Sequence, residues 1–290
     1  MAAKLIDGRK VADQIYADLE SDITALKRKG VIPKLTVVLV GDDPASAVYV
    51  RMKAKACEKL GLISETLTFP ASMTQKEILQ LIDQLNANSS VHGILVQMPL
   101  PDQMDANEVI ERISPEKDVD GFHPVNKGRL QSGLDAFLPC TPFGVQKMLE
   151  YSGISTVGKN VVIVGRSQIV GMPLALLLAQ KRNNADATVT ICHSRTKNID
   201  FFTKNADIVI AAIGKPEFIT ASMVAENSIV IDVGVNRVED PRSERGYKLV
   251  GDVKFDEVSE KVQAITPVPG GVGPMTIAML MYNTVKAAQE

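Results

Sequence analysis

Hydrophobic residues in the first half of the chain follow two different periods. Between Leu5 and Lys27 they recur every three or four positions, which predicts an amphipathic helix that stops at Gly30. The unbroken run from Leu35 to Val40 suits a strand that is buried on both faces of a parallel sheet. Further elements are expected as a helix over 45–60, a helix opened by a Thr74 and Glu77 capping box, and a strand over 91–96.

Short apolar runs continue this alternation in the second half of the chain. Segments with helical periodicity separate most of the runs, which begin at Val161, Ala187, Ala206, Ser228 and Val262. Strands that alternate with helices are typical of parallel sheets with right-handed crossovers. The pattern therefore predicts the α/β class.

A polar, proline-rich stretch over 114–142 interrupts the pattern. It carries many turn-forming residues and little periodicity, so it marks a boundary between domains. We predict two α/β lobes with a cleft between them. The first lobe would comprise residues 1–140 plus 275–290, and the second would comprise residues 141–274.

Composition and charge limit the partners that the chain can have. Of 290 residues, 45% are hydrophobic, and 32 basic residues against 34 acidic ones leave a net charge of −2. We therefore expect neither nucleic acid nor a membrane surface as a partner, and any anion site must be local. The first residues lack the apolar centre of a signal peptide, and no run approaches the roughly 20 apolar residues of a membrane span.

Cysteine and histidine residues are few and scattered. Cys57, Cys140 and Cys192 are odd in number and form no C-x-x-C motif, which argues against a disulfide framework. The three histidines show no ligand spacing, so no metal site is predicted. A reducing cytoplasm fits this composition.

The segment VVIVGRSQIVGMP places a glycine turn between a strand and a helix. Gly165 would permit a tight turn, and Gly171 would let the helix approach the strand or a ligand closely. Unpaired amides and the helix dipole attract anions at such a turn, which predicts phosphate binding. The turn is neither a P-loop nor a serine-nucleophile elbow, because it lacks G-K-[ST] and G-x-S-x-G. Alone, two glycines also fit a simple reversal of the chain.

The next strand lacks the acidic residue that is typical of NAD-binding units. Such units carry Asp or Glu about 20 residues past the turn, where it binds the ribose 2′-hydroxyl. Here the strand runs into His193, Ser194, Arg195 and Thr196. Together with Arg166, these residues supply hydroxyl and guanidinium donors that match a 2′-phosphate. We therefore predict NADP as the cofactor, the alternative being that both arginines are ordinary surface charges.

Tyr49 and Lys53 lie on one face of the helix over 45–60. They are four residues apart, so their side chains lie one above the other. A buried stripe is expected beside them, formed by Val48, Met52, Ala56 and Leu60. Partial desolvation at its edge would lower the pKa of Lys53 and suit it to acid–base catalysis near neutral pH. The alternative is an ordinary solvated lysine.

Three polar residues are further candidates for a site. Gln97 follows a buried strand, at the carboxyl edge where open α/β sheets bind ligands. Asp118 and Asp120 lie in a loop, where a carboxylate can pair with the N–H donors of a heterocycle. Each residue alone is more often a loop residue with a structural hydrogen bond.

The segment ITPVPGGVGPMT joins a strand to the last helix. Gly270, Gly271 and Gly273 would let the backbone approach a flat ligand, and Pro274 suits the first turn of a helix. We expect this loop to contact a ligand.

These motifs together resemble those of one enzyme family. YVRMK, GILVQMPLP, PEKDVDGFHP, VGRSQIVGMP, CHSRT, IDVGVN and TPVPGGVGPMT are similar, in the same order, to motifs of the bifunctional methylenetetrahydrofolate dehydrogenase/methenyltetrahydrofolate cyclohydrolase (FolD) family. The resemblance implies NADP-dependent oxidation of 5,10-methylenetetrahydrofolate, followed by hydrolysis to 10-formyltetrahydrofolate. It also implies that lobe 1–140 plus 275–290 binds folate, that the Rossmann-like domain 141–274 binds NADP, and that the chain forms a homodimer through the cofactor domain.

The resemblance assigns roles to individual residues. Lys53 corresponds to the catalytic lysine, Tyr49 to its partner, Gln97 to the amide that holds the lysine, and Asp120 to the aspartate that anchors the pterin. The implied cofactor contacts are Gly165, Arg166, Ser167, Gly171, Ser194 and Val235, the last where the family commonly has isoleucine. The implied substrate contacts are Tyr49, Val96, Asp120, Pro269, Gly270, Gly273 and Thr276.

One departure and two alternatives qualify this interpretation. The polar segment from Lys181 to Ala187 is longer than is usual in the family, which puts the length of the preceding helix in doubt. Another NADP-dependent two-lobe dehydrogenase is the first alternative, but it leaves the Tyr49 and Lys53 pair without a specific role. A redox-sensing NADP-binding module without catalysis is the second, and the presence of all four predicted catalytic residues argues against it.

Overall fold

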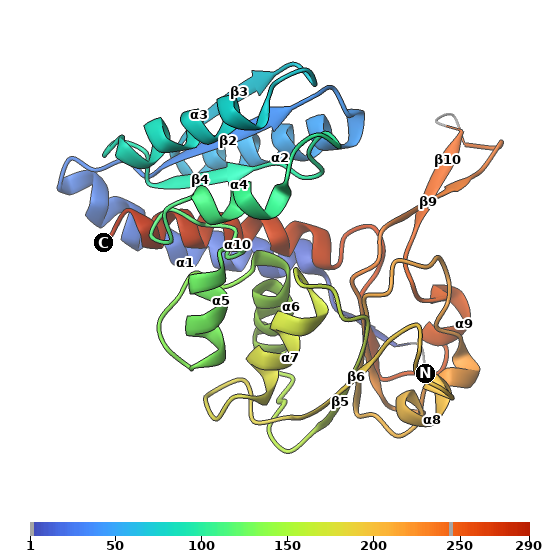
Figure 1. The fold of residues 1–290 in the computed structure, drawn as a ribbon. Helices are drawn as coiled ribbons and strands as arrows, with labels where there is room; N and C mark the ends of the chain where they lie inside the picture. Colours follow the sequence, from blue (N-terminus) through green and yellow to red (C-terminus); the bar gives the residue numbers. More distant parts are fainter. Residues whose placement is uncertain (1–2, 244–245) are drawn as a thin grey trace. The chain divides into compact units, whose positions relative to one another are not determined.

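The computed structural model describes residues 3–243 and 246–290, and the chain forms two compact units (Figure 1). Unit 1 contains residues 1–13 and 141–276, and unit 2 contains residues 14–140 and 277–290. The change of unit at Thr141 falls within the polar, proline-rich stretch of the sequence. Both units are built from parallel strands and helices, so the predicted α/β class is confirmed.

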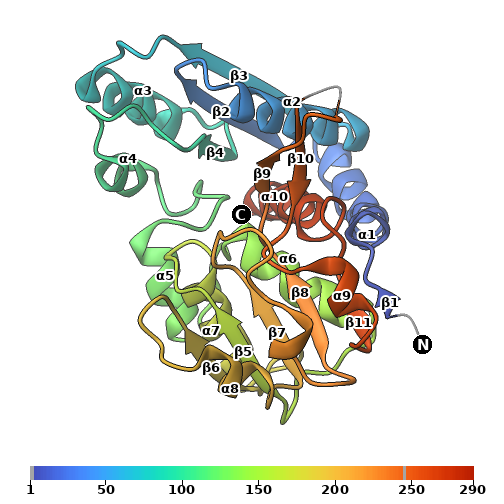
Figure 2. The ribbon, with the colours of Figure 1, turned by 90° about the vertical axis from the view of Figure 1, so that its right-hand side faces the viewer.

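Unit 1 contains a six-stranded sheet with the order β1-β11-β8-β7-β5-β6 (Figure 2). All five neighbouring pairs run parallel. The strands are β1 (Lys4–Leu5), β5 (Asn160–Val164), β6 (Thr188–Cys192), β7 (Ile208–Ala211), β8 (Ile229–Asp232) and β11 (Ala264–Ile265). The chain goes from β5 to β6 on one side and then to β7 on the other side of β5. The carboxyl ends of β5 and β7 therefore form a topological switch point, where ligands of such sheets bind.

Short helices and one hairpin complete unit 1. The helices are α6 (Cys140–Tyr151, whose first residue belongs to unit 2), α7 (Gly171–Ala179), α8 (Ile199–Thr203), η1 (Ala221–Met223) and α9 (Phe255–Ser259). Side chains of α8, η1 and α9 pack with strand residues in one apolar cluster. The antiparallel hairpin of β9 (Asn236–Glu239) and β10 (Tyr247–Val250) was not expected from the sequence.

The polar segment from Lys181 to Ala187 forms an ordered turn after α7. The helix ends at Ala179, and Asn184 and Asp186 adopt positive φ values of 59° and 57°. Ala185 between them is fully buried, and Thr156 donates a hydrogen bond to its carbonyl oxygen. The polar residues therefore lengthen the connection between α7 and β6, and α7 itself is short.

Unit 2 contains a parallel three-stranded sheet with the order β3-β2-β4 (Figure 1). Its strands are β2 (Lys34–Val40), β3 (Ile63–Phe69) and β4 (Gly93–Val96). Helices α3 (Gln75–Ala87) and α4 (Ala106–Arg112) share an apolar cluster with one face of this sheet. Helix α2 (Pro44–Leu60) packs on β2 and β3. Strand β3 was not expected, because its alternating polar residues and half-exposed positions lack a continuous apolar run.

Three more helices complete the elements, and two of them have residues in both units. These helices are α1 (Gly8–Arg28), α5 (Pro124–Gln131) and α10 (Val272–Ala287). The predicted apolar face of α1 is buried, at Val11, Ile15, Leu19, Ile23 and Leu26. The helix begins at Gly8 and not at Leu5, because Leu5 belongs to β1 and the Asp7 carboxylate accepts a hydrogen bond from Arg9 N.

The local signals that end or begin helices are confirmed. Gly61 adopts φ 68° at the C-terminus of α2, and Thr74 and Glu77 form the predicted capping box of α3. Within the described residues, no helix combines the length and the apolar composition that a membrane span requires.

Candidate active site

Helix α2 carries Lys53 on its buried face. The predicted stripe was wrong for Val48 and Met52, which are 44% and 43% exposed, while Leu60 is half-buried. Ala56 of the predicted stripe is buried, as expected, and the other buried residues of α2 are Ser46, Val50, Lys53 and Cys57. Residues 50, 53 and 57 recur at helical spacing, so Lys53 lies within the buried stripe and not beside it. Lys53 is only 8% exposed, which excludes the alternative of an ordinary solvated lysine.

Strand alternation directs Gln97 toward Lys53. Ile94 and Val96 of β4 belong to the apolar cluster of α3 and α4, so the next residue points to the opposite face, on which α2 packs. Lys53 Nζ donates a hydrogen bond of 2.9 Å to Gln97 Oε1. Gln97 Nε2 donates to Met98 O at 2.8 Å, which fixes the orientation of the amide. The two predicted residues are thus brought together, 44 positions apart in the sequence.

Burial shifts the pKa values of Lys53 and of two neighbouring side chains. It lowers the pKa of Lys53, although the nearby Asp120 carboxylate opposes the shift. Burial also raises the pKa of Asp120, against the opposing effect of Lys53. The pKa of the buried Cys140 thiol is raised well above its ordinary value by burial and by Asp120. The amine, the carboxyl and the thiol therefore form one electrostatic cluster in which neutral forms are favoured.

A hydrogen-bond network holds the loop that carries Asp120. The Asp118 carboxylate, 2% exposed, accepts hydrogen bonds from Phe122 N, His123 N and Asn126 Nδ2. Burial raises the pKa of Asp118 to about 6. Of the two aspartates singled out in this loop, Asp118 thus makes structural bonds, while Asp120 faces the lysine.

Two further candidates of unit 2 lie at the edge of this cluster. Tyr49, one turn before Lys53 on α2, is 41% exposed, so its ring is available to a ligand. Val96 directly precedes Gln97, and its side chain is 5% exposed within the apolar cluster of α3 and α4.

The glycine turn of unit 1 lies at the switch point of the six-stranded sheet. Gly165 follows β5 with φ 136°, and a Cβ there would overlap the carbonyl oxygen of Ala212, just past β7. A Cβ at Gly171 would overlap the carbonyl oxygen of Gly165. Both glycines are therefore required for the close approach of β5, β7 and the start of α7. These contacts give both glycines a structural role in the turn, and their contact with a cofactor stays a prediction.

The predicted phosphate contacts gather at the carboxyl ends of β5 and β6. Val164 pairs with Cys192, so Arg166 and the His193–Thr196 segment follow neighbouring strand ends. Arg166, Ser167, Ser194 and Arg195 are all exposed there. Ser167 Oγ accepts a hydrogen bond from Val170 N at 3.1 Å, which tightens the turn before α7.

The remaining cofactor and substrate candidates of unit 1 lie in two loops and at the start of α10. Val235 is 49% exposed in the loop after β8. The loop from Pro269 leads into α10, which begins at Val272, so Gly273 and Pro274 belong to the first turn of the helix. Thr276 shares a 2.9 Å hydrogen bond with Thr141.

Two buried aspartates of unit 1 were not singled out from the sequence. Asp232 ends β8, Asp252 follows β10, and they are 3% and 0% exposed. Burial raises the pKa of Asp232 to about 7, and the Asp252 carboxylate adds to the shift. In the sequence, each aspartate lies within two residues of a glycine, in the segments IDVG and GDV. This pattern alone did not indicate a buried network, which only the hydrogen bonds of the fold reveal.

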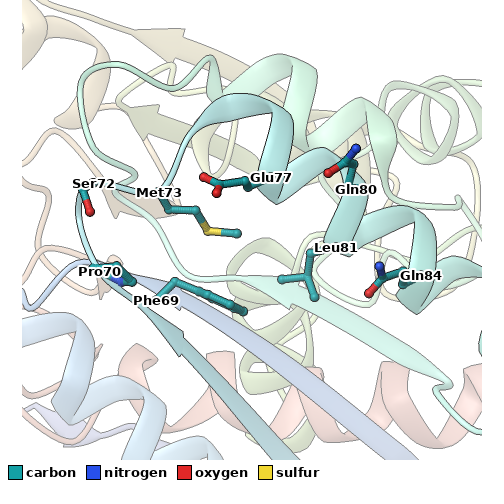
Figure 3. Close-up of a pocket in the computed structure, with 8 residues that line it drawn as sticks. All are labelled: Phe69, Pro70, Ser72, Met73, Glu77, Gln80, Leu81 and Gln84. Atoms are coloured by element: carbon teal, nitrogen blue, oxygen red, sulfur yellow. The ribbon is translucent and has the colours of Figure 1, made fainter.

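A separate hollow in unit 2 contains none of these candidates (Figure 3). It lies between the end of β3 and helix α3 and is lined by Phe69, Pro70, Ser72, Met73, Glu77, Gln80, Leu81 and Gln84. Its carboxylate, Glu77, is already bound to Thr74 in the capping box. We therefore do not assign chemistry to this hollow.

The fold and the glycine turn define a dinucleotide-binding α/β protein, and a buried lysine held by an amide is typical of an enzyme. Comparison with known families makes the class specific. The catalytic-domain model of tetrahydrofolate dehydrogenase/cyclohydrolase matches residues 6–120, and the NAD(P)-binding-domain model matches residues 139–290. The chain belongs to the tetrahydrofolate dehydrogenase/cyclohydrolase family.

Individual relatives agree over the full length. The bifunctional protein FolD of Halalkalibacterium halodurans is 54% identical over 290 residues, which are 100% of each chain. The solved structure of the bifunctional enzyme FolD from Campylobacter jejuni is 50% identical, with a TM-score of 0.93 and 99% of each chain covered. The Trypanosoma brucei dehydrogenase-cyclohydrolase, solved with NADP and an inhibitor, is 40% identical with a TM-score of 0.93, covering 100% of this chain and 98% of that one. These comparisons support the predicted family, both activities and NADP as cofactor.

Proposed function

We propose that the protein oxidises 5,10-methylenetetrahydrofolate with NADP and hydrolyses the methenyl product to 10-formyltetrahydrofolate, with Lys53 as the general acid and base. The observation that carries this proposal is the buried amine of Lys53, held 2.9 Å from Gln97 Oε1 beside Asp120. A lysine with a lowered pKa exchanges protons near neutral pH, as the hydrolytic step requires.

The turn between β5 and α7 fits a dinucleotide. Glycines at positions 165 and 171 let the ends of β5 and β7 and the start of α7 lie close together. The amides at the N-terminus of α7 then lie at the switch point of the sheet, where a pyrophosphate would bind. Arg166 and Ser194, with Arg195, would hold the 2′-phosphate at the edge that lacks an acidic residue. Ser167, Gly171 and Val235 complete the proposed cofactor contacts. NADP, when bound, accepts the hydride from the methylene carbon.

The dehydrogenase step requires little proton transfer from the protein. The carbon that loses the hydride lies between two nitrogens, so resonance stabilises the cation that forms. The residues mainly align the substrate. We assign the pterin to Asp120 and Tyr49. Val96, Pro269, Gly270, Gly273 and Thr276 stay predicted substrate contacts on the basis of the family resemblance.

The cyclohydrolase step requires a base and then an acid. Water loses a proton as it attacks the methenyl carbon, and N5 gains a proton before the bond to it breaks. Neutral Lys53 would accept the first proton and return it to N5, while Gln97 keeps Nζ in place through both transfers. The same lysine thus matters more for hydrolysis than for hydride transfer.

Assembly and location are part of the proposal. The family resemblance supports a homodimer formed through the cofactor domain. The three cysteines are free and buried, which suits the reducing cytoplasm.

One assay tests the function as a whole. The purified protein is incubated with 5,10-methylenetetrahydrofolate and NADP, while reduced cofactor and methenyl absorbance are followed together. We expect NADPH to appear, with the methenyl compound rising and then decaying to the formyl product. A parallel incubation without folate must produce no NADPH. Absence of NADPH across pH and salt conditions would refute the dehydrogenase, and a stable methenyl signal would refute the cyclohydrolase.

A further inference from the structure

A buried carboxylate joins the loop that follows β7 to Asn236, the first residue of β9, at the end of the loop that follows β8. Asp252 Oδ2 accepts hydrogen bonds from Ile213 N and Gly214 N at 2.7 and 2.8 Å. Its other oxygen, Oδ1, accepts from Asn236 Nδ2 at 2.9 Å. Strands β7 and β8 are neighbours in the sheet (Figure 2), so one side chain connects two adjacent strand ends.

A second carboxylate holds the first in place. Asp232 Oδ1 accepts from Gly234 N and from Asp252 N, and Asp232 Oδ2 accepts from Val253 N at 2.9 Å. Both oxygens are thus occupied by amides of the β8 loop and of the Asp252 segment. Asp252 is thereby anchored through its own backbone as well as through its side chain.

Two glycines make room for this arrangement. A Cβ at Gly234 would overlap the Asp252 carboxylate, and a Cβ at Gly251 would overlap the Asp232 carboxylate. Any other residue at either position would push a carboxylate away from its donors. The backbone is therefore adapted to the two side chains at both points of contact.

The free-energy cost of burying two carboxylates indicates that they have a role beyond stabilising the fold. Among the described residues, no ion pair is formed by either carboxylate, and both are almost fully buried. Buried charges that lack a counterion are expensive, and apolar residues fill such space at lower cost. What the carboxylates supply, and apolar residues do not, is a defined geometry for the amides of two loops.

Those loops lie at the proposed cofactor edge. Ala212, directly before Ile213, is in contact range of Gly165 in the glycine turn, and Val235 lies between Gly234 and Asn236. Gly214 and Val235 are exposed, so apolar packing does not hold them. We propose that Asp252, anchored by Asp232, is a positioning residue for the dehydrogenase, which sets the β7 and β8 loops in the geometry that binds NADP. This inference rests on the proposed location of the cofactor.

The two activities provide the test, because hydrolysis of the methenyl substrate needs no NADP. We expect Asp252→Ala to weaken NADP binding, measured by calorimetry, about tenfold or more and to lower the dehydrogenase kcat/KM by a similar factor. Its cyclohydrolase rate, assayed without NADP, should stay within about twofold of the wild-type value. Asp256→Ala, which removes an exposed carboxylate of the same unit, is the matched control and should change neither activity.

The conservative variant Asp252→Asn separates the positioning of the loops from the negative charge of the carboxylate. In Asp252→Asn, the new amide oxygen still accepts from Ile213 N and Gly214 N, and its NH₂ group donates to Asn236 if that amide rotates. We therefore expect most of the NADP affinity to return. If Asp252→Ala does not fold, Asn236→Ala decides the matter, because it removes only the bond to the β8 loop and should weaken NADP binding about threefold or more.

The outcomes that overturn the inference are distinct from failure of the proposed function. Unchanged NADP affinity in folded Asp252→Ala, or in Asn236→Ala, refutes the positioning role. A parallel loss of both activities also refutes it, because a general loss of structure would then explain the effect. Arg166→Ala is measured alongside: if it leaves NADP affinity unchanged, the proposed cofactor site itself fails.

Discussion

The properties of Lys53 come from its position on the buried face of α2. Its amine has one amide acceptor, Gln97, and a carboxylate neighbour, Asp120, in a place from which water is largely excluded. Burial lowers the pKa of the lysine more than Asp120 raises it. This lowered pKa supports the proposal that Lys53 takes up and releases a proton during hydrolysis.

Replacement of Lys53 by methionine separates the two activities. Methionine keeps the length and fits the apolar surroundings, so Lys53→Met is expected to fold. We expect the hydrolysis of methenyltetrahydrofolate to fall by about 10²- to 10⁴-fold, the usual contribution of a general acid or base. The reduction of NADP with the methylene substrate should fall much less. Hydrolysis at the wild-type rate would disprove the assignment, and Lys55→Met, at an exposed position of the same helix, serves as the control.

Asp118 predicts a pH dependence of stability. Because burial raises its pKa from 3.8 to about 6, the protonated form is favoured in the folded state. This contribution is fully present below pH 3.8 and is lost as the pH rises through about 6. The cost of Asp118→Asn should therefore be greater near pH 4.5 than near pH 7.5, by on the order of 2 kcal/mol.

Urea unfolding at the two pH values measures this difference. The exposed Asp102→Asn should show no such change between the same conditions. A cost that grows with pH would mean that the carboxylate, and not the acid, is the form favoured at this position.

At the level of elements, backbone contacts tightly constrain the turn between β5 and α7. Gly171 is the first residue of α7, and its missing side chain lets the helix start against the carbonyl oxygen of Gly165. The position of the helix N-terminus, and thus of its amides, depends on this contact.

Two glycine substitutions should have opposite effects. Gly171→Ala inserts a methyl group into the turn, so we expect it to destabilise the fold by about 1–3 kcal/mol and to weaken NADP binding. Gly128→Ala lies in α5, where a Cβ meets nothing within 4 Å, and should stabilise the fold by about 0.5–1 kcal/mol. Chemical unfolding and NADP titration of both variants measure these effects. Equal effects at the two positions would contradict the packing argument.

Helices and strands with a regular or unbroken pattern of hydrophobic residues could be predicted from the sequence. Strands in which polar and hydrophobic residues are mixed could not. Helix α1, strand β2 and the capping box of α3 have strong local signals and are confirmed. Strand β1 has two residues, and β3 and the hairpin of β9 and β10 expose alternate positions, so their patterns are weak. They depend on partners that are distant in the sequence.

In the candidate site too, local sequence signals could be predicted, and contacts between distant residues could not. Lys53 and Gln97 could be paired only through their motifs, since 44 residues separate them. The stripe at Val48 and Met52 was wrong because a hydrophobic residue type does not require burial. Asp232 and Asp252 bind mostly backbone amides, whose positions no residue type reveals.

For the whole molecule, the balance of charge makes anion binding a local property. A net charge of −2 provides no general attraction for a cofactor with several phosphates. We therefore propose that the donors at the ends of β5 and β6 supply both the affinity and the choice between NADP and NAD.

Arg166→Ala tests this at one residue. Loss of a guanidinium contact to the 2′-phosphate should weaken NADP binding by about 10- to 100-fold and NAD binding much less. Lys248→Ala removes the same charge from an exposed position on β10 and should affect both cofactors equally and weakly. Dissociation constants of both cofactors measure the change. Equal losses for NADP and NAD in Arg166→Ala would refute its role as the selector.

The buried amine of Lys53 also determines how the enzyme reacts with electrophiles. With its pKa lowered by burial, the nitrogen carries a free electron pair at a pH where exposed lysines are protonated. Such a nitrogen attacks acyl and sulfonyl groups. Because we propose that the pterin binds beside Lys53, we expect a pterin that carries an activated ester or a sulfonyl fluoride to react at this side chain, which would make Lys53 an attachment point for a covalent inhibitor.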